Sequence, residues 1–274
     1  MPFLLVKGRF MPQAGIPDGD SVRFRADNLN LWAKLEGVAP RLGKGTKTKD
    51  TVQLRFEGID AIEKGAIKSL ATQSLDNMLQ LIGYDKSNNP EPAGYILTRM
   101  TDDRSGRPIA FVFAGKTSLQ DGTEIFLDGT MARISVNLKL AKAGFGYPLY
   151  YNTLFTSLRE EFNKAIAKAK SGGSGYWSVD QTNTGVTVHN YADLATIPPI
   201  WPKLWRRLQE FLRQHDSLGG FLDFLEKRNE RVAILSCNEE CGLQDLVEVR
   251  DDQVRLTESP ENIRVVAKAG RRMR

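Results

Sequence analysis

The sequence predicts an α+β protein in which a small β-barrel covered by helices is followed by a smaller α+β unit. Five or six short strand-like segments alternate with helix-like segments over roughly the first 175 residues, which is typical of a small barrel with packed helices. After the glycine- and serine-rich residues 171–175, two helix-like segments precede a series of short strands. We therefore expect two domains, residues 1–180 and residues 181–274.

The elements of the first domain are predicted from the spacing of their apolar residues, which differs between a half-buried strand and an amphipathic helix. The expected strands are residues 3–6, 21–25, 52–59, 95–100 and 109–114. The expected helices are residues 66–82, 133–143 and 153–170, and Gly83 and Gly144 are suited to end the first two. The polar residues 27–50 are interpreted as a basic loop inserted between two strands.

The second domain begins with an amphipathic helix that places Leu204, Leu208 and Phe211 on one face. A second helix is expected near residues 221–227, and strands are expected at residues 232–236, 246–249, 253–256 and 263–267. The residues of this domain do not indicate a chemical activity. We expect an accessory α+β domain, with a regulatory protein partner as one option.

Composition excludes several classes of protein. With 41% hydrophobic and 26% charged residues, the 274-residue chain is neither disordered nor collagen-like. Two cysteines do not make a disulfide framework or a four-ligand zinc site. The two histidines, His189 and His215, lie late in the chain, so chemistry in the first domain must use carboxylates, cations or a metal. The net charge of +5 belongs wholly to residues 1–180 and would attract a polyanion.

No part of the sequence predicts a membrane span or a secretory signal. The apolar runs fall far short of the roughly 20 residues that a spanning helix needs. The N-terminus lacks the charged and apolar regions of a signal peptide. We therefore expect a cytoplasmic protein with no membrane partner.

Three short segments of the first domain carry candidate catalytic side chains. These are Asp18 and Asp20 around a glycine turn, Arg55 in a strand followed by Asp60 and Glu63, and Arg107 after a second glycine turn. Taken singly, each is more often a plain turn or a solvated ion pair. Together, carboxylates and arginines without a histidine suit phosphodiester hydrolysis assisted by a hard cation. Guanidinium groups bind phosphate oxygens in bidentate fashion, which favours a phosphate-binding role for the arginines.

The same segments carry a resemblance to a known family. The matching text is IPDGDSV at residues 16–22, LRFEGIDAIE at 54–63, DRSGRPIAFVF at 103–113, VN at 136–137, and Gly144. In order and placement this text resembles the staphylococcal nuclease (thermonuclease) family over about residues 1–180. The resemblance implies a five-stranded OB-fold barrel with packed helices. It also implies a hydrolase, a calcium-dependent endonuclease that cleaves phosphodiester bonds of DNA and RNA.

The resemblance also implies roles for individual residues. Asp20, Asp60 and the carbonyl of Ala61 would hold Ca²⁺, with another divalent cation as an alternative, and Asp18 would lie just behind them. Glu63 would be the general base, and Arg55 and Arg107 would clamp the phosphate.

The chain departs from the family at two positions and adds candidate contacts. Ile62 stands where the family usually has proline, and Ser105 where its prototype has tyrosine. Further candidates for nucleic-acid binding are Lys44, Lys47 and Lys49 in the basic loop, and Tyr147, Tyr150 and Tyr151. For these lysines and tyrosines, a solvated loop and simple packing are the alternatives. A non-catalytic nucleic-acid-binding or scaffold module on the same barrel is the alternative function.

Overall fold

The apolar N-terminal residues form β1 (Phe3–Phe10), the central strand of the largest sheet in the computed structural model, which describes residues 2–102 and 104–266. The sheet has the order β3-β2-β1-β6-β7-β4, and β8 also pairs with β1. Its other strands are β2 (Arg23–Ala26), β3 (Thr51–Gln53), β4 (Arg55–Phe56), β6 (Ala93–Thr101), β7 (Pro108–Ala114) and β8 (Glu124–Ile125). All five predicted strand regions of the first domain therefore contain strands, and β1 extends beyond its predicted end.

The two ends of this sheet are adjacent in the sequence. β3 pairs with β2, β4 pairs in parallel with β7, and only Leu54 separates β3 from β4. The backbone N–H of Leu54 donates to the carbonyl of Val22 at 2.9 Å. A single stretch of chain thus pairs on both of its sides, and this stretch carries Arg55.

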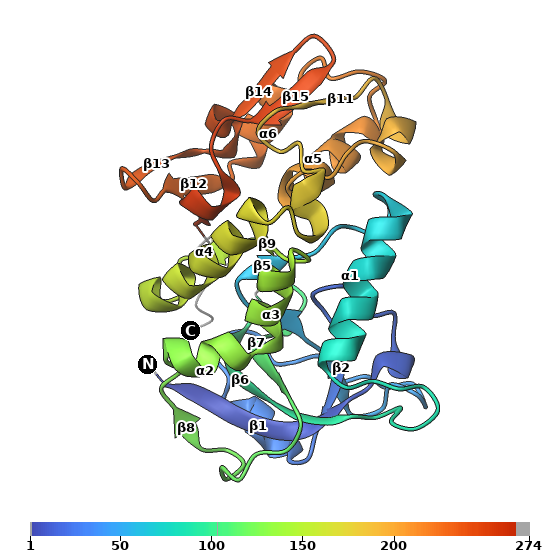
Figure 1. The fold of residues 1–274 in the computed structure, drawn as a ribbon, viewed down its shortest axis with the longest axis vertical. Helices are drawn as coiled ribbons and strands as arrows, with labels where there is room; N and C mark the ends of the chain where they lie inside the picture. The colour runs from blue at the N-terminus through green and yellow to red at the C-terminus, as the bar shows by residue number, and fades with distance from the viewer. Residues whose placement is uncertain (1, 103, 267–274) are drawn as a thin grey trace.

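Helices cover the sheet in the lower lobe of Figure 1. They are α1 (Lys68–Leu81), α2 (Gly129–Ile134), α3 (Val136–Ala143) and α4 (Thr156–Ser171). The single helix predicted for residues 133–143 is wrong at its start, because Ser135 is extended and ends α2. Its hydroxyl accepts a hydrogen bond from the N–H of Leu138 and so caps a new helix, α3.

Asn137 at the start of α3 joins this helix to the sheet. Its side-chain amide donates to the carbonyls of Glu57 and Ala110, each at 2.9 Å, and its oxygen accepts from the N–H of Val112. Asn137 is fully buried. Its three hydrogen bonds satisfy its own buried amide and tie α3 to the sheet.

The upper lobe of Figure 1 contains most of the remaining elements. In chain order the further strands and helices are β5 (Ile59–Asp60), β9 (Tyr147–Pro148), β10 (Tyr150–Tyr151), β11 (Val186–Thr187), α5 (Pro202–Leu212), α6 (Phe221–Arg228), β12 (Arg231–Ile234), β13 (Glu239–Gly242), β14 (Val247–Arg250), β15 (Gln253–Leu256) and β16 (Ile263–Val265). Short 3₁₀ helices occupy Pro12–Ala14, Leu29–Lys34, Gly175–Ser178, Tyr191–Ala195, Leu243–Leu246 and Pro260–Asn262. The mixed α+β class is confirmed.

The two lobes are joined by a strand pair and by an ion pair. β16 pairs in parallel with β10, and Lys170 forms an ion pair with Glu261 at 2.7 Å. The core of the upper lobe also includes Ile62, Tyr147 and Tyr176 from the first 180 residues. The division at residue 180 stays a prediction, and contacts cross it extensively. In the part of the chain that the structure describes, no helix has the length and apolar character to cross a membrane.

Candidate functional site

The turn that carries Asp18 and Asp20 packs tightly against the rest of the site because its central residue is glycine. A Cβ added to Gly19 would lie 1.9 Å from the hydroxyl of Ser74 in α1 and 2.8 Å from the Cβ of Ala61. The carbonyl of Asp20 accepts a hydrogen bond from the N–H of Phe56 at 3.0 Å. The turn is thereby held beside β4 and beside the segment that follows β5.

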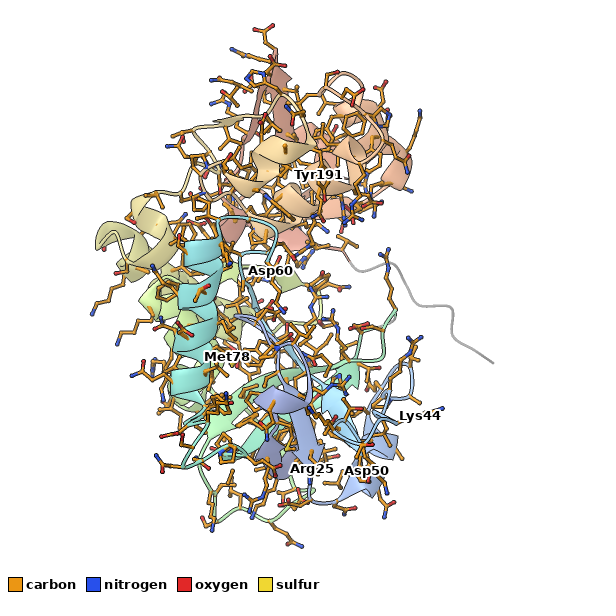
Figure 2. All side chains as sticks on the ribbon, turned by 90° about the vertical axis from the view of Figure 1, so that its right-hand side faces the viewer. Arg25, Lys44, Asp50, Asp60, Met78 and Tyr191 are labelled. Carbon is orange, nitrogen blue, oxygen red and sulfur yellow. The ribbon has the colours of Figure 1, made fainter. Side chains whose placement is uncertain are left out.

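β5 supplies the second acidic part of the site. Asp60 lies opposite Tyr147 in the antiparallel pair of β5 and β9, and only 4% of Asp60 is exposed. Ala61 is also buried, and Glu63 follows at the edge of the site, partly exposed. Figure 2 shows Asp60 at the level where the two lobes meet.

The proximity of these carboxylates changes their acidity. Burial, together with the negative charges of Asp18 and Asp60, raises the pKa of Asp20 well above its ordinary value, against the opposing effect of Arg55. Burial also raises the pKa of Glu63, although an arginine next to it acts in the opposite direction. The structure therefore brings Asp18, Asp20, Asp60 and Arg55 into one electrostatically coupled group, with Glu63 at its edge.

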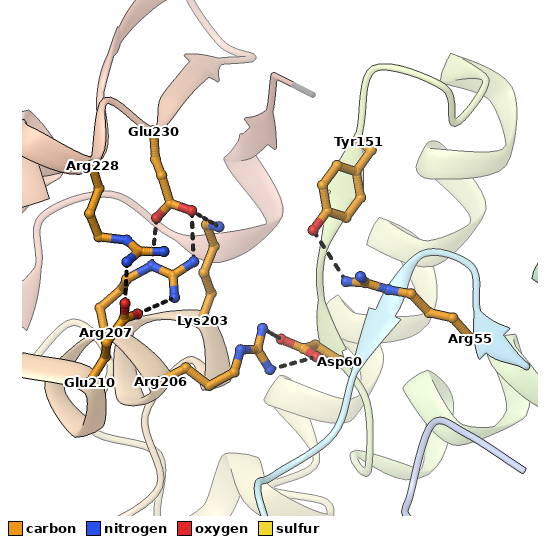
Figure 3. Close-up of polar contacts among 9 residues, drawn as sticks. All are labelled: Arg55, Asp60, Tyr151, Lys203, Arg206, Arg207, Glu210, Arg228 and Glu230. Carbon is orange, nitrogen blue, oxygen red and sulfur yellow. Dashed lines mark hydrogen bonds and ion pairs between the residues drawn. The ribbon is translucent and has the colours of Figure 1, made fainter. Parts of the chain in front are cut away.

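That arginine is Arg206 of α5, which the sequence analysis did not identify. Its two terminal nitrogens donate to the two oxygens of Asp60 at 3.1 and 2.6 Å, and one also donates to Glu63 at 2.5 Å. Figure 3 shows Arg206 reaching Asp60 from the upper lobe, while Arg55 lies on the other side. The apolar stripe of α5 predicts a buried face, but no local signal indicates that a residue beside it meets Asp60, 146 positions earlier.

Arg55 lies beside one of the candidate tyrosines. Its guanidinium donates to the hydroxyl of Tyr151 at 3.2 Å, and its central carbon lies 5.2 Å from the centre of the Tyr151 ring. Both side chains are partly exposed. Of the three tyrosines, Tyr151 is thus the one that the structure brings to the site.

Tyr147 and Tyr150 lie in the cores instead. Both rings are fully buried, and their hydroxyls donate to Asp180 and Asn163, each at 2.7 Å. Burial raises the pKa of both phenols well above the ordinary value. These two residues match the packing alternative, because neither ring presents a free face to a nucleotide.

Arg107 is bonded within its own turn. Its Nε donates to Asp102 at 3.0 Å and to the hydroxyl of Ser105 at 2.9 Å. Burial acts to raise the pKa of Asp102, but hydrogen bonds from Ser105 and Arg107 outweigh it and lower the value. Ser105, where the resemblance expects tyrosine, thus helps to fix the side chain of Arg107 through its Nε, and the phosphate-clamp role of Arg107 stays a prediction.

The three candidate lysines are exposed on the basic loop, which a backbone bond from Gly43 to Thr51 closes at its base. They are Lys44, Lys47 and Lys49. Figure 2 shows Lys44 on the lower lobe, apart from Asp60. The structure does not bring these lysines together with the carboxylates.

The chemistry of the site residues suits a hard cation, although their present arrangement does not form a cation site. Within residues 2–102 and 104–266, no group of three or more His, Cys, Asp and Glu side chains is placed to hold a metal ion. However, Oδ1 of Asp18 is buried without a hydrogen-bond partner, and carboxylate oxygens are the ligands that calcium prefers. Both oxygens of Asp60 are bonded to Arg206. The residue types therefore suit a divalent cation, while Asp60 is occupied by Arg206 in this structure.

No protein-family model matches the chain, and no curated protein is significantly similar to it.

Proposed function

We propose that the protein is a nuclease that hydrolyses phosphodiester bonds of DNA or RNA with the help of Ca²⁺ or another divalent cation. The observation that carries this proposal is the meeting of Asp20, from the glycine turn, with Arg55, Asp60 and Glu63, from residues 55–63. Two aspartates, a glutamate and an arginine at one place supply ligands for a hard cation, a base and a phosphate-binding group.

We also propose that the large sheet is an OB-type barrel. The adjacency of β3 and β4 supports this, because residues 51–56 pair with β2 on one side and with β7 on the other. When one continuous stretch of chain forms both ends of a sheet, the sheet curves back on itself, as it does in a barrel. Arg55 then lies on the barrel wall, next to the carboxylates.

Each side chain has a defined task in this proposal. Asp20 and Asp60 would hold the cation, with Asp18 behind them, and the cation when bound would polarise the phosphoryl oxygen. Glu63 would accept a proton from the attacking water, a task that its raised pKa favours. Arg55 would bind a phosphate oxygen, and Tyr151 would hold the guanidinium of Arg55 in place.

A non-catalytic nucleic-acid-binding module is the second candidate. Arg206 favours it, because this residue pairs with both Asp60 and Glu63 and so partly compensates their negative charge without a cation. A module of this kind would bind single strands through its basic surface in a manner that salt weakens and a chelator does not affect.

Cleavage assays on the full-length protein distinguish the two candidates. Labelled single-stranded DNA and RNA would be incubated with Ca²⁺, Mg²⁺, Mn²⁺ or EDTA, at cation concentrations that calorimetry shows to saturate the protein. We expect cleavage that EDTA abolishes and that Glu63→Gln or Arg55→Ala reduces by at least about a hundredfold. Glu226→Gln, at an exposed position in α6, serves as the matched control. Binding without cleavage at saturating cation would favour the non-catalytic module.

A further inference from the structure

Arg206 of α5 forms ion pairs with two carboxylates of the candidate site, those of Asp60 and Glu63. Arg206 bonds to both oxygens of Asp60 and to one oxygen of Glu63. Burial would lower the pKa of Arg206, but the charges of Asp60 and Glu63 outweigh it and raise the value. The guanidinium is therefore a fixed positive charge that binds at least one carboxylate on which a cation would depend.

The backbone of α5 is anchored independently of this ion pair. The indole N–H of Trp201 donates to the carbonyl of Pro148 at 2.9 Å, and that of Trp205 donates to the carbonyl of Leu194 at 3.0 Å. On the same helix, Arg207 bonds to Glu230 through two nitrogens, at 2.6 and 2.7 Å. The helix can therefore keep its position while the side chain of Arg206 changes its own.

The side chain of Arg206 has a route to solvent. It is 30% exposed, whereas that of Asp60 is 6% exposed. A rotation about its side-chain bonds would free both oxygens of Asp60 without unfolding any element. Such rotations are fast in partly exposed side chains.

We infer that Arg206 is an intramolecular competitor of a divalent cation, which must displace it from Asp60 in order to bind. This inference rests on the proposed function for the identity of the cation ligands. In the closed state Arg206 is paired with Asp60 and Glu63, and in the open state the cation takes its place. The apparent affinity for the cation is then the intrinsic affinity of the open state multiplied by the fraction of molecules that are open. The C-terminal part of the chain thereby sets the cation concentration at which the site becomes available.

Calcium binding to full-length Arg206→Gln tests the inference directly. Isothermal titration with CaCl₂ should show a dissociation constant at least about tenfold lower than that of the wild type, within the usual range of coupling between sites. Calcium should also raise the melting temperature of Arg206→Gln more than that of the wild type. Arg213→Gln is the control, because Arg213 is exposed at the C-terminal end of the same helix, and it should bind calcium like the wild type.

A second variant protects the test against misfolding. Removal of Arg206 leaves the buried carboxylate of Asp60 without its partner, which can destabilise the fold. Arg206→Lys keeps the charge but loses the bidentate fork, and it should bind calcium more tightly than the wild type, by a smaller factor. Equal calcium affinity in the wild type and in the folded variants would overturn the inference.

Calcium affinity tests this inference, whereas cleavage of DNA or RNA tests the proposed function, so the two can fail separately. Tight calcium binding by Arg206→Gln without cleavage of DNA or RNA would support the competition and reject the nuclease. Cation-dependent cleavage with no effect of Arg206 on calcium affinity would support the nuclease and reject the competition.

Discussion

The backbone N–H of Ile62 donates a hydrogen bond to the hydroxyl of Tyr176 at 3.4 Å, and both residues belong to the core of the upper lobe. Proline, which the staphylococcal nuclease family usually has at this position, has no N–H to donate. Ile62 therefore anchors the segment between Asp60 and Glu63 to the core of the upper lobe. Ile62 thus has a structural role here.

Ile62→Pro should destabilise the protein by about 2 kcal/mol or more, because it removes this hydrogen bond and part of a buried side chain. Ile62→Val keeps the N–H and should cost about 1 kcal/mol. Urea unfolding at equilibrium measures both free energies. Equal stability of the two variants would show that the bond to Tyr176 contributes nothing.

The acidic group was largely predictable from the sequence, whereas the residue that neutralises it was not. Local elements place these carboxylates. The glycine turn holds Asp18 and Asp20, and β5 holds Asp60. Arg206 meets Asp60 only through the packing of α5, which no local pattern encodes.

Secondary structure was predictable where apolar residues form a continuous run or a helical stripe. The prediction failed where polar residues become a strand by pairing with a neighbour. The apolar run of β7 and the apolar stripe of α5 indicate their elements, as the structure confirms. β13 (Glu239–Gly242) is missing from the prediction, because its polar residues form a strand only by pairing with β12. Tyr147 and Tyr150 show the same limit, since nothing in the sequence distinguishes a buried tyrosine from one at a binding surface.

Tyr151 should contribute to nucleic-acid binding through its contact with Arg55. Tyr151→Ala removes both the hydrogen bond and the ring beneath the guanidinium, and it should weaken binding of single-stranded DNA about tenfold. Tyr151→Phe keeps the ring and should stay within about twofold of the wild type. Fluorescence anisotropy of a labelled oligonucleotide in EDTA measures binding without cleavage. Tyr191→Ala, at an exposed position on the upper lobe, is the control, and wild-type affinity in Tyr151→Ala would exclude the contact.

The ion pairs of Glu230 should make stability fall in acid. Burial acts to raise the pKa of Glu230, but Arg207 and Lys203 outweigh it and lower the pKa from 4.5 to about 2. Since the folded pKa is the lower one, the stabilisation is present above about pH 4.5 and is lost as the pH falls toward 2. A shift of this size corresponds to about 3 kcal/mol.

Glu230→Gln isolates this contribution. At pH 7 the variant should be less stable than the wild type, because it leaves the charges of Lys203 and Arg207 partly uncompensated. The difference should shrink by about 3 kcal/mol as the pH falls through the range from 4.5 to 2. Denaturant unfolding at a series of pH values measures it, and Glu226→Gln, at an exposed position in α6, should follow the wild-type curve. A difference between wild type and Glu230→Gln that stays constant with pH would show that Glu230 titrates alike in the folded and unfolded chain.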